Sequence, residues 1–477
     1  MTRLRAPITR LCAAGLVLVV AAHEAAAQAP SAPTAPPVPP APEPPPDSLL
    51  AQGQAAAQAK NWKSALALFD ACIKSDAPRA PACLWERGWV HWMRGDWAKV
   101  VADWEAVQRV DPARPDLQKY LDQATDNLSL QPILERGRTA DPAAFVSSAP
   151  KGATLRLRAV GDLMISTDFP EGSMNPNIDQ TFTEVAPWLR DADLTFGNLE
   201  GPLCDHGETT KCKPESPPGA CYAFRTPGRF AKLYTDAGFD LLSTANNHAE
   251  DFGRACRIET EALLDAQGIK HSGRPGDLAS TTVNGLKVAM VGFHTNRNSH
   301  YVNDHDSAAL IVRALAATHD IVIVSFHGGA EGGKALHVPD GPEVFYGEER
   351  GDLRRFARAV IDAGADLVIG HGPHVLRGME VYSDRLIAYS LGNFATYGRF
   401  NVKGNAGIGV VLETTLDRSG RFVSGRALPT VQVGAGVPAP DPAAQALPLL
   451  RQLSAEDFGP GAVRVDDDGV LHPPESR

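Results

Sequence analysis

The residues best suited to chemistry are carboxylates, amides and histidines that follow short apolar segments of the chain. In α/β sheets, ligands bind at the carboxyl ends of the strands, and neighbouring glycines let the backbone turn tightly there. We therefore predict one shared site, built from these residues and the segments they follow: Asp162 (154–160), Asn198 and Glu200 (194–197), Asn247 and His248 (239–243), His327 and Glu331 (321–326), His371 and His374 (366–369), and Asn393 (386–390).

This set of side chains predicts a site for one or two divalent metal ions. Carboxylate, amide and imidazole donors without a thiolate favour Mn, Zn or Fe. An ion of this kind lowers the pKa of bound water and stabilises an oxyanion, as hydrolysis requires. The predicted ligands are Asp162, Glu200, Asn247, His327, His371 and His374.

A general acid or base is expected beside the metal. We assign this role to His248, because the pKa of histidine lies near neutral pH, and we group Asp251 with it as a catalytic residue or as a further ligand. Residues expected to orient the ligands or to contact substrate are Asn198, Glu331, His337 and Asn393.

The stretch 239–253 has an alternative interpretation as the start of a helix. Thr244 or Asn246 would cap that helix, and Glu250 and Asp251 would lie in its first turn. The recurrence of polar strand ends elsewhere favours the metal site. Asn246 and Glu250 are then expected to have turn and solvent roles.

The elements that position these residues alternate along 153–427. Short apolar strands alternate with amphipathic helices there, which predicts an α/β fold. Residues 129–152 are expected to be a polar connector, and 428–477 a Pro-, Gly- and Asp-rich tail with one short helical piece. Further expected strands are 287–293 and 408–415, and expected helices are 182–190, 229–237, 256–267, 307–317 and 352–363.

Residues 48–128 contain a helical pattern that repeats at an offset of 35 residues. Trp62 aligns with Trp97 and Phe69 with Trp104, while Gly53 and Gly88 occupy a tight contact between helices. This pattern resembles tetratricopeptide repeats. Two interpretations stay open: a docking surface for a protein or peptide partner, and a small helical cap on the next domain.

The N-terminus predicts export. Residues 1–27 have a basic start, a short apolar run and an Ala-rich end typical of a signal peptide, and 28–47 form a Pro/Ala-rich tether. We identify no other membrane-spanning segment and expect a periplasmic or otherwise extracytoplasmic protein. The net charge of −10 and the lack of a long Lys/Arg run argue against a nucleic-acid partner.

Six of the seven cysteines follow the signal segment, and an even number in an exported chain indicates disulfides rather than a zinc site. Cys72 with Cys83 is the best single pair. Cys204, Cys212, Cys221 and Cys256 allow three pairings, and their spacing does not choose between them.

With these residues identified, the chain resembles the CapA family of poly-γ-glutamate capsule synthesis proteins. The matching segments, in the family's order, are GDLM (161–164), GNLEGPL (197–203), TANNHAEDFG (244–253), HGGAE (327–331), GHGPHVLRGMEVY (370–382) and YSLGNF (389–394).

The family is similar to calcineurin-like metallophosphatases, which implies a layered α/β sandwich and a two-metal site. By this likeness the six predicted ligands fall on ligand-type positions, and His248 follows the asparagine as the catalytic histidine does. Two positions differ from the pattern. Met164 stands where those phosphatases have a second ligand, and Gly372 stands where many relatives have a histidine.

Three functions are compatible with this pattern. The first is an exported metal-dependent hydrolase acting on an anionic polymer of the envelope or capsule. The second is a polymer-binding component of a synthesis or export complex, without catalysis. The third is a metal-dependent phosphoesterase.

Overall fold

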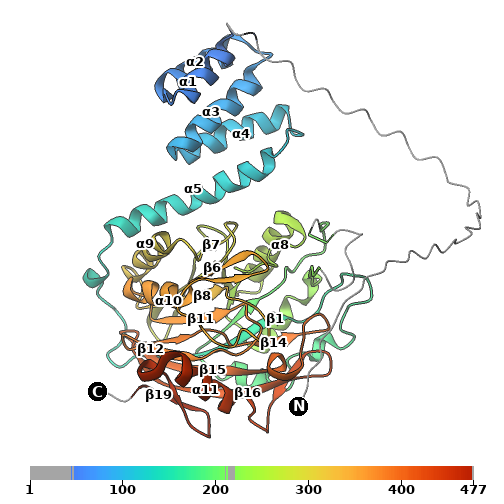
Figure 1. Cartoon of the computed structure of the whole chain (residues 1–477), viewed down its shortest axis with the longest axis vertical. Coiled ribbons are helices and arrows are strands. Elements are labelled where there is room, and N and C mark those ends of the chain that lie inside the picture. The colour runs from blue at the N-terminus through green and yellow to red at the C-terminus, as the bar shows by residue number, and fades with distance from the viewer. Residues whose placement is uncertain (1–44, 46–47, 210, 213–220, 475–477) are drawn as a thin grey trace, which may run out of the picture.

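The computed structural model describes residues 45, 48–209, 211–212 and 221–474. The predicted signal peptide and nearly all of the Pro/Ala-rich segment lie outside the described residues. Figure 1 shows a helical region, drawn in blue, above a larger α/β domain. Within the described residues, none of the helices combines the length and the apolar character needed to span a bilayer.

The helical region consists of two helix pairs that follow the predicted repeat. Two glycines let the helices of each pair approach closely. A Cβ at Gly53 would lie 2.5 Å from Phe69 Cε1, and a Cβ at Gly88 would lie 2.1 Å from Trp104 Nε1. The predicted tight contacts are therefore confirmed. The helices are α1 (Leu49–Gln58), α2 (Trp62–Ser75), α3 (Ala80–Arg94) and α4 (Trp97–Val110).

Helix α5 (Leu117–Thr139) corrects the expected connector, because 129–139 continues the helix. Ile133 of this extension is buried against the α/β domain. Asp126 receives two hydrogen bonds from Arg254, at 3.0 and 2.5 Å. Gly137 lies so close to helix α9 (His305–Ala316) that a Cβ would be 2.1 Å from the Leu310 carbonyl oxygen. The helical region is thus fixed to the domain through one long helix.

The α/β domain contains two mixed sheets. The first has the strand order β18-β19-β16-β15-β1-β2-β3-β4, with β14 beside β1 and β17 beside β16. Its strands β14, β1, β2, β3 and β4 are parallel to their neighbours in that group. The bounds are β1 (Thr154–Met164), β2 (Leu194–Leu199), β3 (Leu241–Ser243), β4 (Lys270–Ser272), β14 (Asn393–Thr396), β15 (Ile408–Asp417), β16 (Phe422–Val433), β17 (Val437–Pro440), β18 (Arg464–Val465) and β19 (Val470–His472).

The second sheet has the order β12-β13-β11-β8-β6-β5, with β7 beside β6, and its central strands β6, β8, β11 and β13 are parallel. A separate hairpin is formed by β9 (Glu343–Phe345) and β10 (Glu348–Gly351). The bounds in the second sheet are β5 (Ala279–Val283), β6 (Leu286–His294), β7 (His300–Tyr301), β8 (Ile321–His327), β11 (Leu367–His371), β12 (Met379–Tyr382) and β13 (Arg385–Ala388).

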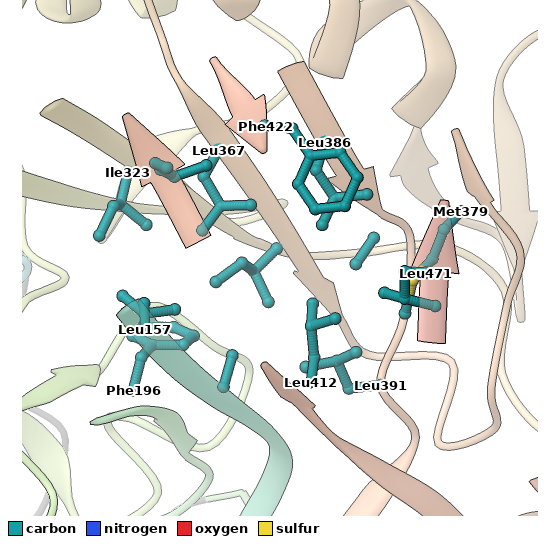
Figure 2. Packing of buried hydrophobic residues seen from close by; sticks show 14 of the residues in the cluster. Leu157, Phe196, Ile323, Leu367, Met379, Leu386, Leu391, Leu412, Phe422 and Leu471 are labelled. Atoms are coloured by element: carbon teal, nitrogen blue, oxygen red, sulfur yellow. The ribbon is translucent and has the colours of Figure 1, made fainter. Parts of the chain in front are cut away.

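The two sheets share one hydrophobic core. Figure 2 shows Leu157 and Phe196 of the first sheet among Ile323, Leu367 and Leu386 of the second, and all five side chains are fully buried. Burial of apolar surface of this extent is the main force holding the sheets together. The α/β class is therefore confirmed, while the specific likeness to metallophosphatases stays a prediction.

Helices cover the outer faces of both sheets, as the burial of their apolar side chains shows. Ile311 and Phe356 pack on the second sheet, and Tyr234 and Leu264 pack on the first. The expected helix 182–190 is shorter than predicted, because Pro187 lies in the first turn and favours a helix start there. The remaining helices are α6 (Ala186–Arg190), α7 (Lys232–Ala237), α8 (Gly253–Ala266), α10 (Leu353–Asp362) and α11 (Ala446–Phe458).

The segment expected as a tail from residue 428 is built into the domain. Strand β16 crosses the expected boundary, and β17, α11, β18 and β19 follow it. Leu447 and Leu450 of α11 and Leu471 of β19 lie in the core between the sheets. Their apolar side chains are the reason that this Pro- and Gly-rich segment folds onto the sheets instead of extending into solvent.

Candidate functional site

Two rows of polar residues meet where the parallel strands of the two sheets end. In the first sheet, the strand register aligns Asn393, Asp162 and Asn198 on β14, β1 and β2. In the second sheet it aligns His327 with His371 on β8 and β11. All five residues are buried. The rows are joined where Asn198 Nδ2 lies 3.3 Å from His327 Nδ1.

Asp162, Glu200 and His327 form the centre of the site. One ligand atom from each lies within 4.8 Å of the others. Both Glu200 oxygens and His327 Nε2 are buried and have no hydrogen-bond partner among the described residues. Buried polar atoms without partners are costly, and a carboxylate is the most costly of them. A cation would satisfy all three atoms.

His374 and Asn393 adjoin this centre. His374 Nδ1 donates to Asp162 Oδ2 at 3.0 Å and lies 3.2 Å from Asn393 Oδ1, and its Nε2 lies 3.6 Å from Glu200 Oε1. Although burial opposes it, the charges of Glu200 and Asp162 raise the pKa of His374 to about 10. A positive imidazolium therefore lies beside the Asp162 carboxylate when no metal ion is bound.

The two other predicted ligands differ in position. Asn247 Oδ1 is buried without a hydrogen-bond partner among the described residues, as expected of an oxygen available to a cation. His371 donates from Nε2 to the Val160 carbonyl at 3.1 Å. It is not among the three residues whose ligand atoms gather. The Nδ1 of His371 is buried without a hydrogen-bond partner among the described residues, so the role of His371 as a ligand stays a prediction.

The ionisation of these groups suits a cation. Burial and the charge of Asp162 raise the pKa of Glu200 well above its ordinary value. Burial opposes ionisation of Asp162, but its hydrogen bond to His374 lowers its pKa below the ordinary range. Burial lowers the pKa of His327 well below its ordinary value, so its imidazole is neutral. Metal ligands must be unprotonated, and a cation would replace the proton that Glu200 otherwise retains.

His248 and Asp251 form a hydrogen-bonded pair beside the centre. His248 Nδ1 donates to Asp251 Oδ2 at 2.6 Å, so its Nε2 is left without a proton and lies 4.0 Å from Glu200 Oε1. Burial lowers the pKa of His248, which keeps the ring neutral near pH 7. A neutral imidazole held by a carboxylate is the usual arrangement of a general base.

Two residues that the sequence analysis did not identify complete this pair. Lys211 Nζ donates to Asp251 Oδ1 at 2.7 Å and to the Asn247 carbonyl at 3.2 Å. The centre of the Phe224 ring lies 4.2 Å from the centre of the His248 ring. The backbone N–H of Phe224 donates to Asp251 Oδ2 at 2.8 Å. The sequence signal that could have found them is their position beside Cys212 and Cys221, which form a disulfide.

The described residues include three disulfides. The predicted pair Cys72–Cys83 is confirmed. The pairing that the sequence left open is Cys204–Cys256 with Cys212–Cys221. The Cys204–Cys256 disulfide ties the loop that follows Glu200 to helix α8, which begins just after Asp251. Both therefore brace segments that carry site residues.

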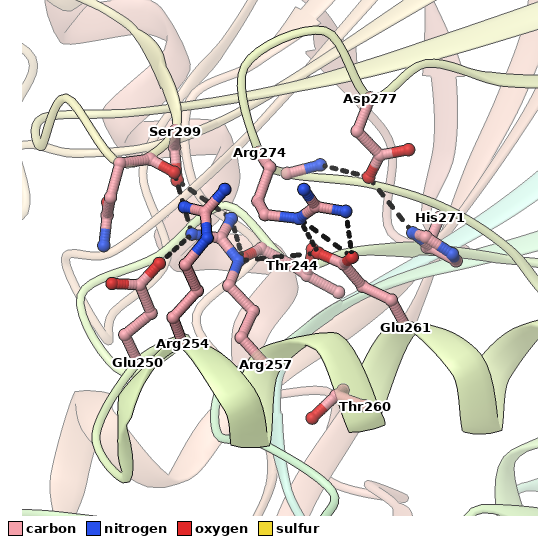
Figure 3. Close-up of polar contacts among 12 residues, drawn as sticks. Thr244, Glu250, Arg254, Arg257, Thr260, Glu261, His271, Arg274, Asp277 and Ser299 are labelled. Carbon is pink, nitrogen blue, oxygen red and sulfur yellow. Dashed lines mark hydrogen bonds and ion pairs between the residues drawn. The ribbon is translucent and has the colours of Figure 1, made fainter. Parts of the chain in front are cut away.

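A buried arginine fixes the loop that carries Asn247 and His248. Figure 3 shows Arg257 of α8 between Thr244 and Glu250. Arg257 donates to Glu250 at 3.1 Å and contacts the Thr244 carbonyl at 3.5 Å. Asn246 Nδ2 donates to Asn198 Oδ1 at 3.1 Å and is buried. The turn role expected for Asn246 is confirmed, because its Oδ1 accepts from the His248 N–H at 3.1 Å. Glu250 is half-buried in the same turn and pairs with the buried Arg257, so its expected role in solvent is only partly met.

The remaining predicted residues lie farther from the centre. Glu331 forms an ion pair with Arg350 at 2.9 Å and lines a cavity of about 800 Å³ that reaches Asn247, His248 and His374. His337 pairs instead with Asp457 of α11 at 2.8 Å. It lines a neighbouring pocket of about 520 Å³ that Glu331 also borders. The structure does not bring His337 into the cavity of the metal-site residues.

Comparison with known proteins agrees with the motifs that surround this site. Residues 156–397 match the family model described as "Bacterial capsule synthesis protein PGA_cap". The chain belongs to this family. The resemblance to the CapA family inferred from the sequence motifs is thereby confirmed. All six predicted ligands lie inside the matched range: Asp162, Glu200, Asn247, His327, His371 and His374.

Several curated relatives carry CapA-type names. The PGA biosynthesis protein CapA of Bacillus subtilis (strain 168) is 30% identical over 253 residues, covering 49% of this chain and 61% of the relative. The capsule biosynthesis protein CapA of Bacillus anthracis is 28% identical over 251 residues, covering 50% and 59%. The chain thus spans about three fifths of the length of these relatives. A solved O-GlcNAc transferase mutant of Thermobaculum terrenum is 12% identical, covering 67% of this chain and 77% of that one, with a TM-score of 0.17.

The backbone at Gly372 explains why this CapA family member has a glycine where many relatives have a histidine. Its φ is +110°, and a Cβ would lie 2.7 Å from the Gly328 carbonyl oxygen and 3.2 Å from His327 Cδ2. There is consequently no room for a histidine at this position.

We expect Gly372→Ala to displace His327 and to lower divalent-metal affinity at least about tenfold, because ligand geometry is lost. Titration of metal into the purified variant would measure this. Gly398→Ala is the matched control, since Gly398 also has a positive φ, of +75°, and has open space around its Cβ position. Equal losses of affinity in the two variants would contradict the prediction.

Proposed function

We propose that this protein acts in the synthesis, export or processing of an anionic envelope polymer of the capsule or poly-γ-glutamate type, through a divalent-metal site of hydrolase type. The observation that carries the proposal is the buried group of Asp162, Glu200 and His327, in which the Glu200 oxygens and His327 Nε2 have no hydrogen-bond partner among the described residues. The names of the CapA relatives supply the polymer class.

The donors in the group fit Mn, Zn or Fe, because two carboxylates and a neutral imidazole suit these ions. Asp162, Glu200 and His327 would hold the ion, with His374 and Asn247 as further donors beside them. A bound ion would supply polarisation of a substrate oxygen and a lowered pKa for a water molecule.

The chain's own residues provide the proton transfer and the positioning. His248 Nε2 would take a proton at the site and return it to the leaving group, while Asp251 holds the imidazole by its Nδ1–H. Lys211 fixes Asp251 and the Asn247 backbone in place. The cavity of about 800 Å³ would admit a segment of polymer.

We propose an extracytoplasmic, periplasmic-type location, supported by the disulfides and by the signal-type sequence at 1–27. The helical region α1–α4 is the proposed docking surface for a protein partner, because its repeat resembles tetratricopeptide repeats.

Metal analysis of the purified protein tests the proposal. We expect close to one or two equivalents of Mn, Zn or Fe in the wild-type protein. Two results together would favour a polymer-binding component without catalysis. The purified protein would bind no divalent metal, and a strain carrying His248→Ala would make unchanged polymer. Turnover of a simple phosphate ester that is lost in Asp162→Ala would instead favour a phosphoesterase.

A further inference from the structure

Besides His374, three cationic side chains line the cavity at the proposed metal site, and two of them pair with carboxylates. Lys211 pairs with Asp251 at 2.7 Å, and Arg350 pairs with Glu331 at 2.9 Å. Arg399 is the third. Among the described residues it has no carboxylate partner, and its buried Nε has no hydrogen-bond partner. A charged donor that faces a cavity without a partner is a binding group for an anion.

Arg399 is nevertheless held in a defined place. Its guanidinium carbon lies 5.3 Å from the centre of the Tyr222 ring. A contact with an aromatic ring uses the face of the guanidinium and leaves its N–H donors free. Tyr222 follows Cys221, which is tied to Cys212 by a disulfide, so the supporting ring is itself anchored.

The residue that follows Arg399 connects it to the site. The Phe400 ring lies 5.1 Å from the His374 ring and 5.2 Å from the Phe224 ring, which packs on His248. Phe400 therefore forms part of the wall between the metal-site residues and the rest of the cavity. Arg399 lies one residue along the chain from this wall.

We propose that Arg399 binds an anionic group of the substrate, a carboxylate or a phosphate, at a subsite next to the group that reacts. This inference rests on the proposed function of the site. Arginine suits the role because its planar donors bind two oxygens of a carboxylate or phosphate together. Lys211 and Arg350 are less suited to it, because the charge of each is balanced by a carboxylate, Asp251 and Glu331. The subsite selects substrates with an anion at a fixed distance from the reacting bond.

The test measures binding of two probes to the full-length protein. A fluorescein-labelled hexamer of γ-linked glutamate reports on carboxylates, and inorganic phosphate reports on phosphate. We expect Arg399→Gln to weaken binding of at least one probe about tenfold or more, and Arg399→Lys to recover part of the loss. Arg421→Gln is the matched control, because Arg421 is exposed, pairs with Asp417 in the turn between β15 and β16 and does not line the cavity.

The probes distinguish the source of the anion, and the metal content distinguishes this proposal from the proposed function. Weaker binding of the hexamer alone identifies a carboxylate subsite, and weaker binding of phosphate alone identifies a phosphate subsite. Unchanged binding of both probes in Arg399→Gln, or no binding of either probe by the wild type, overturns the proposal. The metal content of Arg399→Gln should equal that of the wild type, since Arg399 contacts none of the proposed ligands. Loss of metal in the wild type itself would instead count against the proposed function.

Discussion

Glu200→Gln is expected to lower the affinity for a divalent cation at least about a hundredfold and, at the same time, to stabilise the metal-free protein. Both Glu200 oxygens are buried without hydrogen-bond partners among the described residues, and Asp162 lies beside them. Without a cation, this arrangement is unfavourable. A buried polar group without a hydrogen-bond partner costs about 1–3 kcal/mol, and a charged one costs more, so loss of the Glu200 charge should stabilise the metal-free protein by roughly that amount. The glutamine retains the shape of the side chain but removes the charge that a cation requires.

The pH dependence of the metal-free protein follows from the same residues. The pKa of Glu200 is raised on folding, so the folded state retains a proton that the unfolded chain loses above about 4.5, the ordinary value for glutamate. Stability therefore falls as the pH rises above that value. His374, with its pKa raised to about 10, contributes stability that is fully present below its ordinary value of 6.5 and is lost as the pH rises to about 10. Metal affinity should rise over the same range, because the cation competes with protons.

Calorimetric titration with metal, together with urea unfolding of the metal-free protein at several pH values, checks this prediction. Glu413→Gln is the matched control. Glu413 receives hydrogen bonds from Arg158 at 2.9 and 2.5 Å, and the Arg158 side chain is only 8% exposed. Removing that charge leaves Arg158 with Asp191 as its one carboxylate partner among the described residues, so the control should lose stability and keep its metal affinity. A loss of stability in Glu200→Gln, with metal affinity unchanged, would contradict the proposed metal site.

The sequence predicts the site well at the polar residues of the parallel strands. These residues are far apart along the chain, but the register of a parallel sheet places them side by side. Asp162, Asn198 and Asn393 illustrate this, since they lie within β1, near the end of β2 and at the start of β14, and the register aligns all three. The motifs also identify the family correctly. What the pattern cannot predict is side-chain direction. His371 and His327 are register partners, yet His371 turns toward the Val160 carbonyl.

Other features could not be predicted because they depend on contacts between distant segments. Lys211 has no periodic pattern around it, and it reaches Asp251 because the disulfide Cys212–Cys221 and the fold bring the two together. The extension of α5 to Thr139 depends on the burial of Ile133 against another domain. In the same way, Leu447 packs in the core only once the sheets are in place, so the sequence alone could not show that residues 428–474 are part of the domain.

His248→Gln is expected to lower turnover of the polymer substrate by about 10² to 10⁴ while leaving metal content unchanged, because a general acid or base is lost and no ligand is removed. Glutamine fills a similar volume but cannot take up a proton near pH 7. Asp251→Asn should lower turnover less. The carboxylate that holds Nδ1–H is replaced there by an amide, and the imidazole itself remains.

The readouts are polymer length and amount in a complemented strain, and metal content and thermal stability of the purified variants. His271→Gln is the matched control, because His271 also pairs with an aspartate, Asp277, at 3.1 Å but lies on β4, away from the cavity. If His248→Gln retains its metal and supports the polymer as the wild type does, proton transfer at Nε2 is not part of the function. The metal site would then serve to hold an anionic polymer, and the arrangement of Asp251 and Lys211 around His248 would be a support for the Asn247 loop alone.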